Sequence, residues 1–167
     1  AGHSDDIGAV GITGTYEKDY TLLIAECLKK KLEAEKARVV MVREGKNHVP
    51  LFDRPRIAWA AGADALISVH LNALPEGENP FEKNGFGMYY FQPHSLPFAQ
   101  EVQEAYRRSF LTGKNLSKAV MRDDGLHWGN LALPRTPQMP SILTESAYLI
   151  HPQEEWWIRQ ANFQCDC

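Results

Sequence analysis

The sequence predicts a single α/β domain with an open, mostly parallel, twisted sheet and helices on both of its faces. Residues 64–73 form an apolar run with little charge, and the β-branched Ile67 and Val69 in it are typical of a strand buried on both faces. Periodicity alone does not exclude a buried helix there. Helical and strand patterns alternate before this run, as in αβ units. The 167 residues, 44% of them hydrophobic, suffice for one domain with its own core.

Four elements are expected before the central run. They are a glycine-rich loop at 1–14, a helix at 21–36, a short strand at 38–43 and an alanine-rich helix at 53–61. The loop holds four glycines and has neither a helical nor a strand period. Asp19 is the candidate N-cap of the first helix, which places Glu17 just before that helix. Asp53 is able to cap the second helix.

After the central run we expect a polar loop at 74–85, a strand at 86–91 and a helix at 96–110. A helical turn at 116–121 and a segment of undecided structure at 126–133 follow. The last two elements are a strand at 140–145 and a helix at 152–164. The strand 140–145 ends on the carboxylate of Glu145. Pro152 suits the first position of the final helix, and the glutamates that follow it suit the positive end of the helix dipole.

Charge, hydropathy and cysteine content exclude some classes of protein and leave others open. A net charge of -3 and a pI near 6.1 give no electrostatic reason to expect a nucleic-acid partner. No apolar run reaches the roughly 18 residues that a membrane span needs. The spacing of Cys27, Cys165 and Cys167 matches neither a disulfide framework nor a metal finger, so the redox compartment and the roles of the last two stay open.

Four side chains are candidates for one site at the carboxyl edge of the sheet. His70 and Glu145 lie near the ends of two predicted strands, where ligands collect in open parallel sheets. His3 in the first loop and Glu17 at the helix entrance can reach the same edge. Two imidazoles and a carboxylate suit catalytic zinc, which would leave Glu145 free for proton transfer. Taken singly, each residue also has a structural interpretation as a core histidine, a frayed terminal residue or a partner of the helix dipole.

Four segments, in this order, resemble a known family. They are Gly2-His3 with Asp6, Gly8, Ala9 and Gly11; Glu17-Lys18-Asp19; Ser68-Val69-His70-Leu71-Asn72-Ala73; and Met139-Pro140-Ser141-Ile142-Leu143-Thr144-Glu145. Together they are similar to the zinc-dependent N-acetylmuramoyl-L-alanine amidases of the amidase-3 type. The resemblance implies an open α/β sheet and one zinc ion per chain on His3, Glu17 and His70. It also implies that Glu145 is the catalytic glutamate.

The resemblance implies a function and a place of action. The function is hydrolysis of the amide bond between N-acetylmuramic acid and L-alanine, with peptidoglycan or a muropeptide as partner, in the periplasm or outside the cell. It leaves open whether a protein activator is needed. Residues 1–167 would be one catalytic domain that lacks the family's first strand and the end of its last helix. Two alternatives remain: a module that keeps zinc and binds the cell wall without cleaving it, and a zinc hydrolase of another amide.

The remaining histidines are interpreted as surface or capping residues, because each lies in a loop or helix-boundary pattern: His48, His94, His127 and His151. His127 is the least settled of them, since it lies in the segment 126–133, whose secondary structure the pattern leaves undecided.

Overall fold

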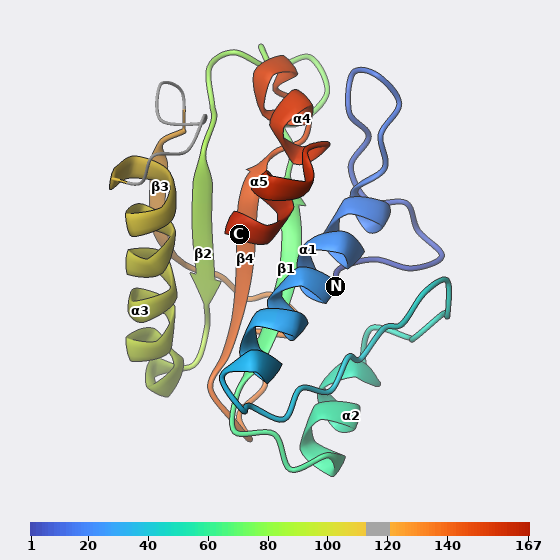
Figure 1. The fold of residues 1–167 in the computed structure, drawn as a ribbon, viewed down its shortest axis with the longest axis vertical. Helices are drawn as coiled ribbons and strands as arrows, with labels where there is room; N and C mark the ends of the chain where they lie inside the picture. The colour runs from blue at the N-terminus through green and yellow to red at the C-terminus, as the bar shows by residue number, and fades with distance from the viewer. Residues whose placement is uncertain (113–120) are drawn as a thin grey trace.

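Four strands form one sheet in the order β1-β4-β2-β3 in the computed structural model, which describes residues 1–112 and 121–167 (Figure 1). The strands are β1 (Leu66–Asn72), β2 (Phe86–Tyr90), β3 (Asp123–Trp128) and β4 (Ser141–Tyr148). β1 pairs with β4 and β2 pairs with β3 in parallel, whereas β2 and β4 are antiparallel. The predicted open, mostly parallel α/β sheet is confirmed.

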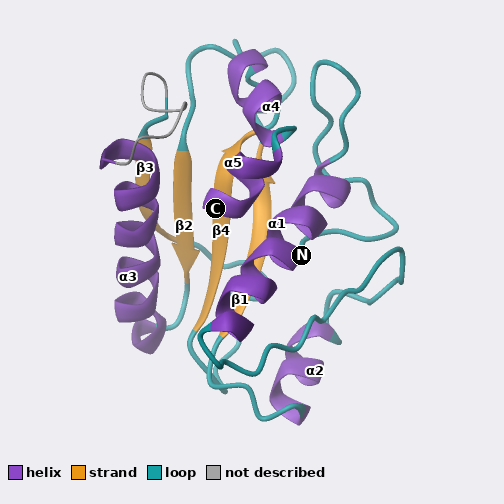
Figure 2. Cartoon of the chain, in the orientation of Figure 1, coloured by secondary structure: helices purple, strands orange, loops and turns teal. Residues whose placement is uncertain are grey.

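Helices cover the two faces of the sheet unequally. The helices are α1 (Glu17–Ala34), α2 (Arg54–Ala60), α3 (Leu96–Tyr106), α4 (Pro152–Ile158) and α5 (Ala161–Asp166). A 3-10 helical turn, η1 (Pro93–Ser95), precedes α3, and a π-helical segment, η2 (Arg107–Thr112), follows it. Figure 2 shows α1, α3 and α5 in front of the strands. Val69 and Leu71 belong to the main core, which includes residues of these helices, whereas Leu66 packs with Ala58 of α2. Alternate residues of β1 thus serve opposite faces.

Most of the predicted elements are present. β1, β2 and β4 correspond to the strands expected at 64–73, 86–91 and 140–145. Likewise, α1, α2 and α3 correspond to the helices expected at 21–36, 53–61 and 96–110. β4 continues past Glu145 to Tyr148. The undecided segment 126–133 contributes its first residues to β3. The helical turn expected at 116–121 lies, apart from Met121, outside the described residues.

The start of α1 differs from the prediction. The helix begins at Glu17, its N-cap position is held by Tyr16, and Asp19 lies inside the first turn. Backbone carbonyls of the preceding loop take the place of a capping side chain, since the Glu17 N–H donates to the Ala9 carbonyl at 3.0 Å. The expected N-cap at Asp19 was therefore wrong, and Glu17 is a helical residue whose position is fixed by the loop.

The strand predicted at 38–43 is wrong. This segment has no ladder partner among the described residues and runs as irregular chain. A cavity of about 620 Å³ is lined by Val40 and Val42 of this segment and by Val69 of β1 among others, while Met41 packs against the main core. A β-ladder needs a neighbouring strand about 4.8 Å away, so this segment does not form a strand despite its β-branched residues.

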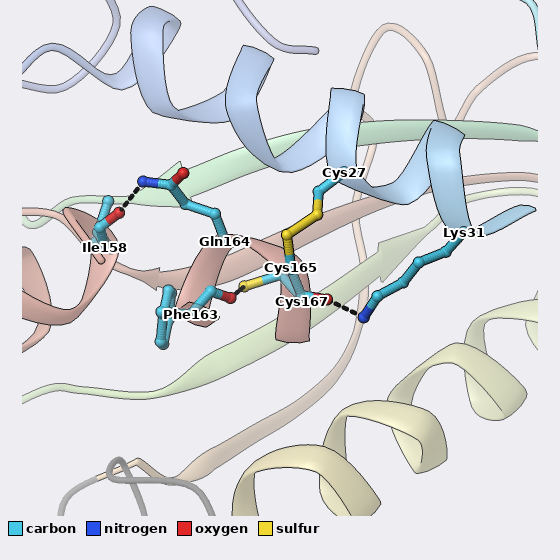
Figure 3. Close-up of a disulfide and its surroundings, with 7 residues drawn as sticks. All are labelled: Cys27, Lys31, Ile158, Phe163, Gln164, Cys165 and Cys167. Carbon is cyan, nitrogen blue, oxygen red and sulfur yellow. Dashed lines mark hydrogen bonds between the residues drawn. A yellow bond between two sulfur atoms is a disulfide. The ribbon is translucent and has the colours of Figure 1, made fainter. Parts of the chain in front are cut away.

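The C-terminal helical region is divided and is covalently tied to α1. The predicted helix 152–164 breaks at Gln160, whose extended backbone starts α5. A disulfide joins Cys27 of α1 to Cys165 of α5 across 138 residues of sequence, a pairing that the cysteine pattern did not predict (Figure 3). The side-chain amide of Gln164 donates to the Ile158 carbonyl at 2.8 Å, which satisfies a carbonyl at the end of α4. Cys167 is a free thiol.

Candidate metal centre

Three side chains from separate segments meet at the carboxyl end of β1. Glu17 Oε2 lies 2.9 Å from His3 Nε2, and Glu17 Oε1 lies 2.9 Å from His70 Nδ1. One ligand atom from each of the three residues can be chosen so that all lie within 4.8 Å of one another. Two imidazoles and one carboxylate form a donor set that suits a catalytic zinc ion, so the residues present fit this metal.

Glu17 is held rigidly between the two histidines. Its Oε2 accepts the Ala9 N–H at 2.8 Å and its Oε1 accepts the Leu71 N–H at 3.1 Å, so the loop and β1 both orient the carboxylate. Burial alone would raise the pKa of Glu17, but the hydrogen bonds with His3 and His70 outweigh burial and hold the pKa far below its usual value. Glu17 is therefore an anion at neutral pH, as a metal ligand must be.

His3 is fixed by contacts on several sides. Its backbone is in the left-handed region, with φ of 58°, a conformation that few residues other than glycine adopt. Arg54 donates to the His3 carbonyl at 2.8 Å, and the buried Arg43 donates to the neighbouring Gly2 carbonyl at 3.0 Å. Asp6 hydrogen-bonds His3 Nδ1, which leaves Nε2 directed at Glu17. Sequence reasoning did not assign a role to Arg43.

Glycine is required at Gly2 by the approach of His70. A Cβ atom placed on Gly2 would lie 2.4 to 2.7 Å from three atoms of the His70 ring. A Cβ atom on Gly8, whose φ is +68°, would lie 2.5 Å from Glu17 Oε2. The two glycines therefore leave room for the two ligand side chains that the loop packs against.

Gly2→Ala is expected to displace the His70 ring and to lower the amount of zinc bound per chain, because the added methyl and the ring cannot share this space. Elemental analysis after dialysis measures the effect, with Gly87→Ala as the matched control. A Cβ atom on Gly87 meets nothing nearer than 3.5 Å, so this control should keep the zinc content of the wild type. Unchanged zinc in Gly2→Ala would show that the His70 ring has another way to reach the metal.

Glu145 lies beside His70 on the neighbouring strand. The two residues are partners in the parallel register of β1 and β4, so their side chains project from the same face. The Oε2 atom of Glu145 is buried and has no hydrogen-bond partner within residues 1–112 and 121–167. Burial, and then the negative charge of Glu17, raise the pKa of Glu145 well above its usual value. A carboxyl group in this state can accept a proton and give it back.

The other histidines divide into two groups. His48 is exposed and lies 2.9 Å from Asp5, His94 is exposed, and His151 caps α4 by accepting the Glu154 N–H at 3.4 Å. These three match the interpretation as surface or capping residues. His127 fits that interpretation only in part, because its side chain is 35% exposed but lies within β3, with its ring packed on Tyr89 at a centroid distance of 4.9 Å.

The matches with known proteins agree with this geometry. The model of the Amidase_3 family, described as N-acetylmuramoyl-L-alanine amidase, matches residues 1–167. The chain belongs to this family. The family resemblance inferred from the four ordered segments is thereby confirmed, and the match covers the loop, helix and strands that carry His3, Glu17, His70 and Glu145.

Individual amidase relatives agree in sequence and in fold. The endolysin of Bacillus phage SPP1 is 29% identical over 167 residues, covering 99% of this chain and 59% of the endolysin. The chain thus spans little more than half of that relative. The catalytic domain of CwlV from Bacillus (Paenibacillus) polymyxa var. colistinus has a TM-score of 0.83 at 30% identity, covering 99% and 87% of the two chains. The amidase of Clostridium difficile 630 has a TM-score of 0.86 at 33% identity, covering 99% and 86%.

Proposed function

We propose that this chain is a zinc-dependent hydrolase of the amide bond between N-acetylmuramic acid and L-alanine in peptidoglycan. The observation that carries the proposal is the convergence of His3, Glu17 and His70 beside Glu145, whose buried Oε2 makes no hydrogen bond with any described residue. Family membership over residues 1–167 supports the choice of bond. The side chains of His3 and His70 are 22% and 18% exposed, so a substrate can reach this site.

His3, Glu17 and His70 would hold one zinc ion per chain, with Asp6 supporting His3 and the Ala9 and Leu71 N–H groups supporting Glu17. When bound, zinc supplies Lewis-acid polarisation of the scissile carbonyl and lowers the pKa of a water molecule toward about 7. Three protein ligands are the number usual at catalytic zinc sites, whereas structural zinc sites have four. The support for zinc here is the chemistry of the donor set.

Glu145 would move the protons of the reaction. Its carboxylate accepts a proton from the attacking water, and the resulting carboxylic acid donates that proton to the nitrogen of the leaving amine. Burial raises the pKa of Glu145, and this favours the protonated form that the second step uses. The C–N bond breaks, and the products are the lactyl carboxylate of N-acetylmuramic acid and a peptide that begins with L-alanine.

We place this activity outside the cytoplasm. The Cys27–Cys165 disulfide supports this location, since such bonds persist in oxidising compartments. Among the described helices, none is both long and apolar enough to cross a membrane. The partner at the site is peptidoglycan or a soluble muropeptide, and the net charge of -3 gives no support for nucleic acid.

Digestion of purified sacculi tests the proposed function. We expect the zinc-loaded protein to release peptides with a free L-alanine amino terminus, and 1,10-phenanthroline to stop this release until zinc is restored. Mass spectrometry of the products identifies the bond that is cut. Cleavage at a different amide would identify a zinc hydrolase of another substrate. Stoichiometric zinc without any released peptide would identify a cell-wall binding module.

A further inference from the structure

A cluster of polar and aromatic side chains lies on the sheet beyond Glu145. His127 of β3 is the register partner of Tyr89 of β2, and their rings pack at 4.9 Å with an interplanar angle of 30°. Asp124 Oδ2 lies 3.6 Å from His127 Nε2, and the same oxygen accepts the Tyr148 hydroxyl at 3.1 Å. His127 is thus held between a carboxylate and an aromatic ring, although nothing in the proposed reaction uses it.

A glycine separates this cluster from Glu145. Gly87 of β2 lies directly opposite Glu145 of β4 in the antiparallel ladder. Residues paired in this way project from the same face, with their Cβ positions about 4.5 to 5.5 Å apart. A Cβ atom on Gly87 would have His127 Cδ2 and Nε2 at 3.5 Å and the Asp124 Cβ at 3.7 Å. The imidazole therefore leans over Gly87 toward the side of Glu145, with no side chain between them on β2.

Two buried polar atoms on this face make no hydrogen bond within the described residues, although one of them, His127 Nε2, has Asp124 Oδ2 at 3.6 Å. Glu145 Oε2 and His127 Nε2 are both buried and both lack a hydrogen bond in the part of the chain that the structure describes. A buried polar atom without a partner is unfavourable, so two of them on either side of one glycine indicate a place where a ligand supplies the missing hydrogen bonds. Imidazole offers both a donor and an acceptor and can therefore bind peptide groups.

The order of the strands decides which part of the substrate lies there. Along β1-β4-β2-β3 the sheet presents His70, Glu145, Gly87 and His127 in turn. In the proposed function the acyl carbon is held at the metal ligands on the β1 side, and the leaving nitrogen is next to Glu145 on β4. The chain that continues beyond the nitrogen toward β2 and β3 is the peptide half of the substrate.

We propose that His127, oriented by Asp124 and Tyr89, binds the stem peptide beyond its L-alanine. This inference rests on the proposed function. His127 is a substrate-binding residue, and Gly87 is the gap through which the peptide passes between His127 and Glu145. Because such a contact is made in the ground state and the transition state alike, it lowers KM and leaves kcat unchanged.

His127→Ala tests the contact with N-acetylmuramoyl-tripeptide as the substrate. We expect KM to rise about ten-fold with kcat retained, which corresponds to the loss of one or two hydrogen bonds. Zinc content and the thermal midpoint, measured on the same sample, should match the wild type. On N-acetylmuramoyl-L-alanine, which lacks the rest of the stem, kcat/KM of the variant should stay within about two-fold of the wild type. The same loss on both substrates overturns the assignment to the peptide.

Gly87→Ala provides a second variant that leaves His127 in place. Its methyl makes ordinary contacts at 3.5 Å, so the fold should persist while the gap beside Glu145 is filled. We expect its KM for the tripeptide substrate to rise as in His127→Ala. His94→Ala is the matched control, since this exposed histidine on η1 should leave KM unchanged.

The outcomes separate this inference from the proposed function. If the wild type cuts the amide next to N-acetylmuramic acid and both variants keep the wild-type KM, the peptide-binding role of His127 is wrong and the proposed function stands. If the zinc-loaded wild type cuts no muropeptide, the proposed function fails and this inference fails with it. A rise in KM for both variants, restricted to the longer substrate, supports both.

Discussion

Glu145→Gln is expected to lower kcat on a soluble muropeptide by about 10² to 10⁴-fold, the usual contribution of general acid–base catalysis. The carboxamide has nearly the same shape as the carboxyl, but it cannot accept the proton of the attacking water. Zinc should remain bound, because His3, Glu17 and His70 are unchanged. Steady-state kinetics and elemental analysis on one preparation measure both quantities. Glu101→Gln, an exposed position on α3, is the control and should retain full activity.

Three results of this experiment can be told apart. A rise in KM with kcat intact would assign Glu145 to substrate binding, because uniform binding acts equally on substrate and transition state. Loss of zinc would make Glu145 a metal ligand. Full activity with zinc retained would remove Glu145 from the mechanism. Glu145 Oε2 is buried and makes no hydrogen bond within residues 1–112 and 121–167, which favours the catalytic result, since a structural carboxyl would have its own hydrogen bonds.

The parts of the site that the sequence predicts are those carried by strands. His70 and Glu145 follow apolar runs whose secondary structure is evident, and parallel pairing then brings the two residues into register. Glu17 was less accessible to prediction, because the start of α1 is set by the Ala9 carbonyl and not by a capping side chain. A local sequence pattern does not predict a backbone hydrogen bond between a loop and the start of a helix.

Other features depend on contacts between distant segments. The arginines Arg43 and Arg54 hold the loop around His3 through backbone carbonyls, which any sequence can provide. The disulfide joins Cys27 and Cys165, which are 138 residues apart, so spacing gave no indication of it. The residues at 38–43 favour a strand, but a strand forms only if another segment lies beside it to pair with, and residue preferences do not predict that.

β3 explains why the cluster around His127 was missed. Its residues are at most half-buried, and its first two are the acidic Asp123 and Asp124, so neither alternation nor an apolar run marks it as a strand. The strand lies at the edge of the sheet, where charged residues and short length are common. The pairing of Tyr89 with His127 then places the imidazole on the same face as Glu145. The functional proposal for His127 therefore depends on the strand order, which the sequence alone does not provide.

His70→Ala is expected to reduce bound zinc from about one ion per chain to nearly none, because a catalytic site with two remaining protein ligands falls below the usual three. The domain should stay folded. Val69 and Leu71, on either side of His70, are buried in the main core, and this apolar burial does not involve the metal. Elemental analysis and circular dichroism measure the two expectations. His48→Ala is the matched control, since that side chain is 51% exposed and should leave zinc binding intact.

The response of stability to a chelator gives a second, independent reading of the same variant. A metal that binds only the folded state stabilises it by mass action, so EDTA should lower the thermal midpoint of the wild type and of His48→Ala. The midpoint of His70→Ala should not respond to EDTA, because there is no bound ion to remove. Equal zinc in His70→Ala and wild type would refute the ligand assignment. Global unfolding of His70→Ala would instead mean that the metal, and not the apolar core around Val69 and Leu71, holds this end of the sheet together.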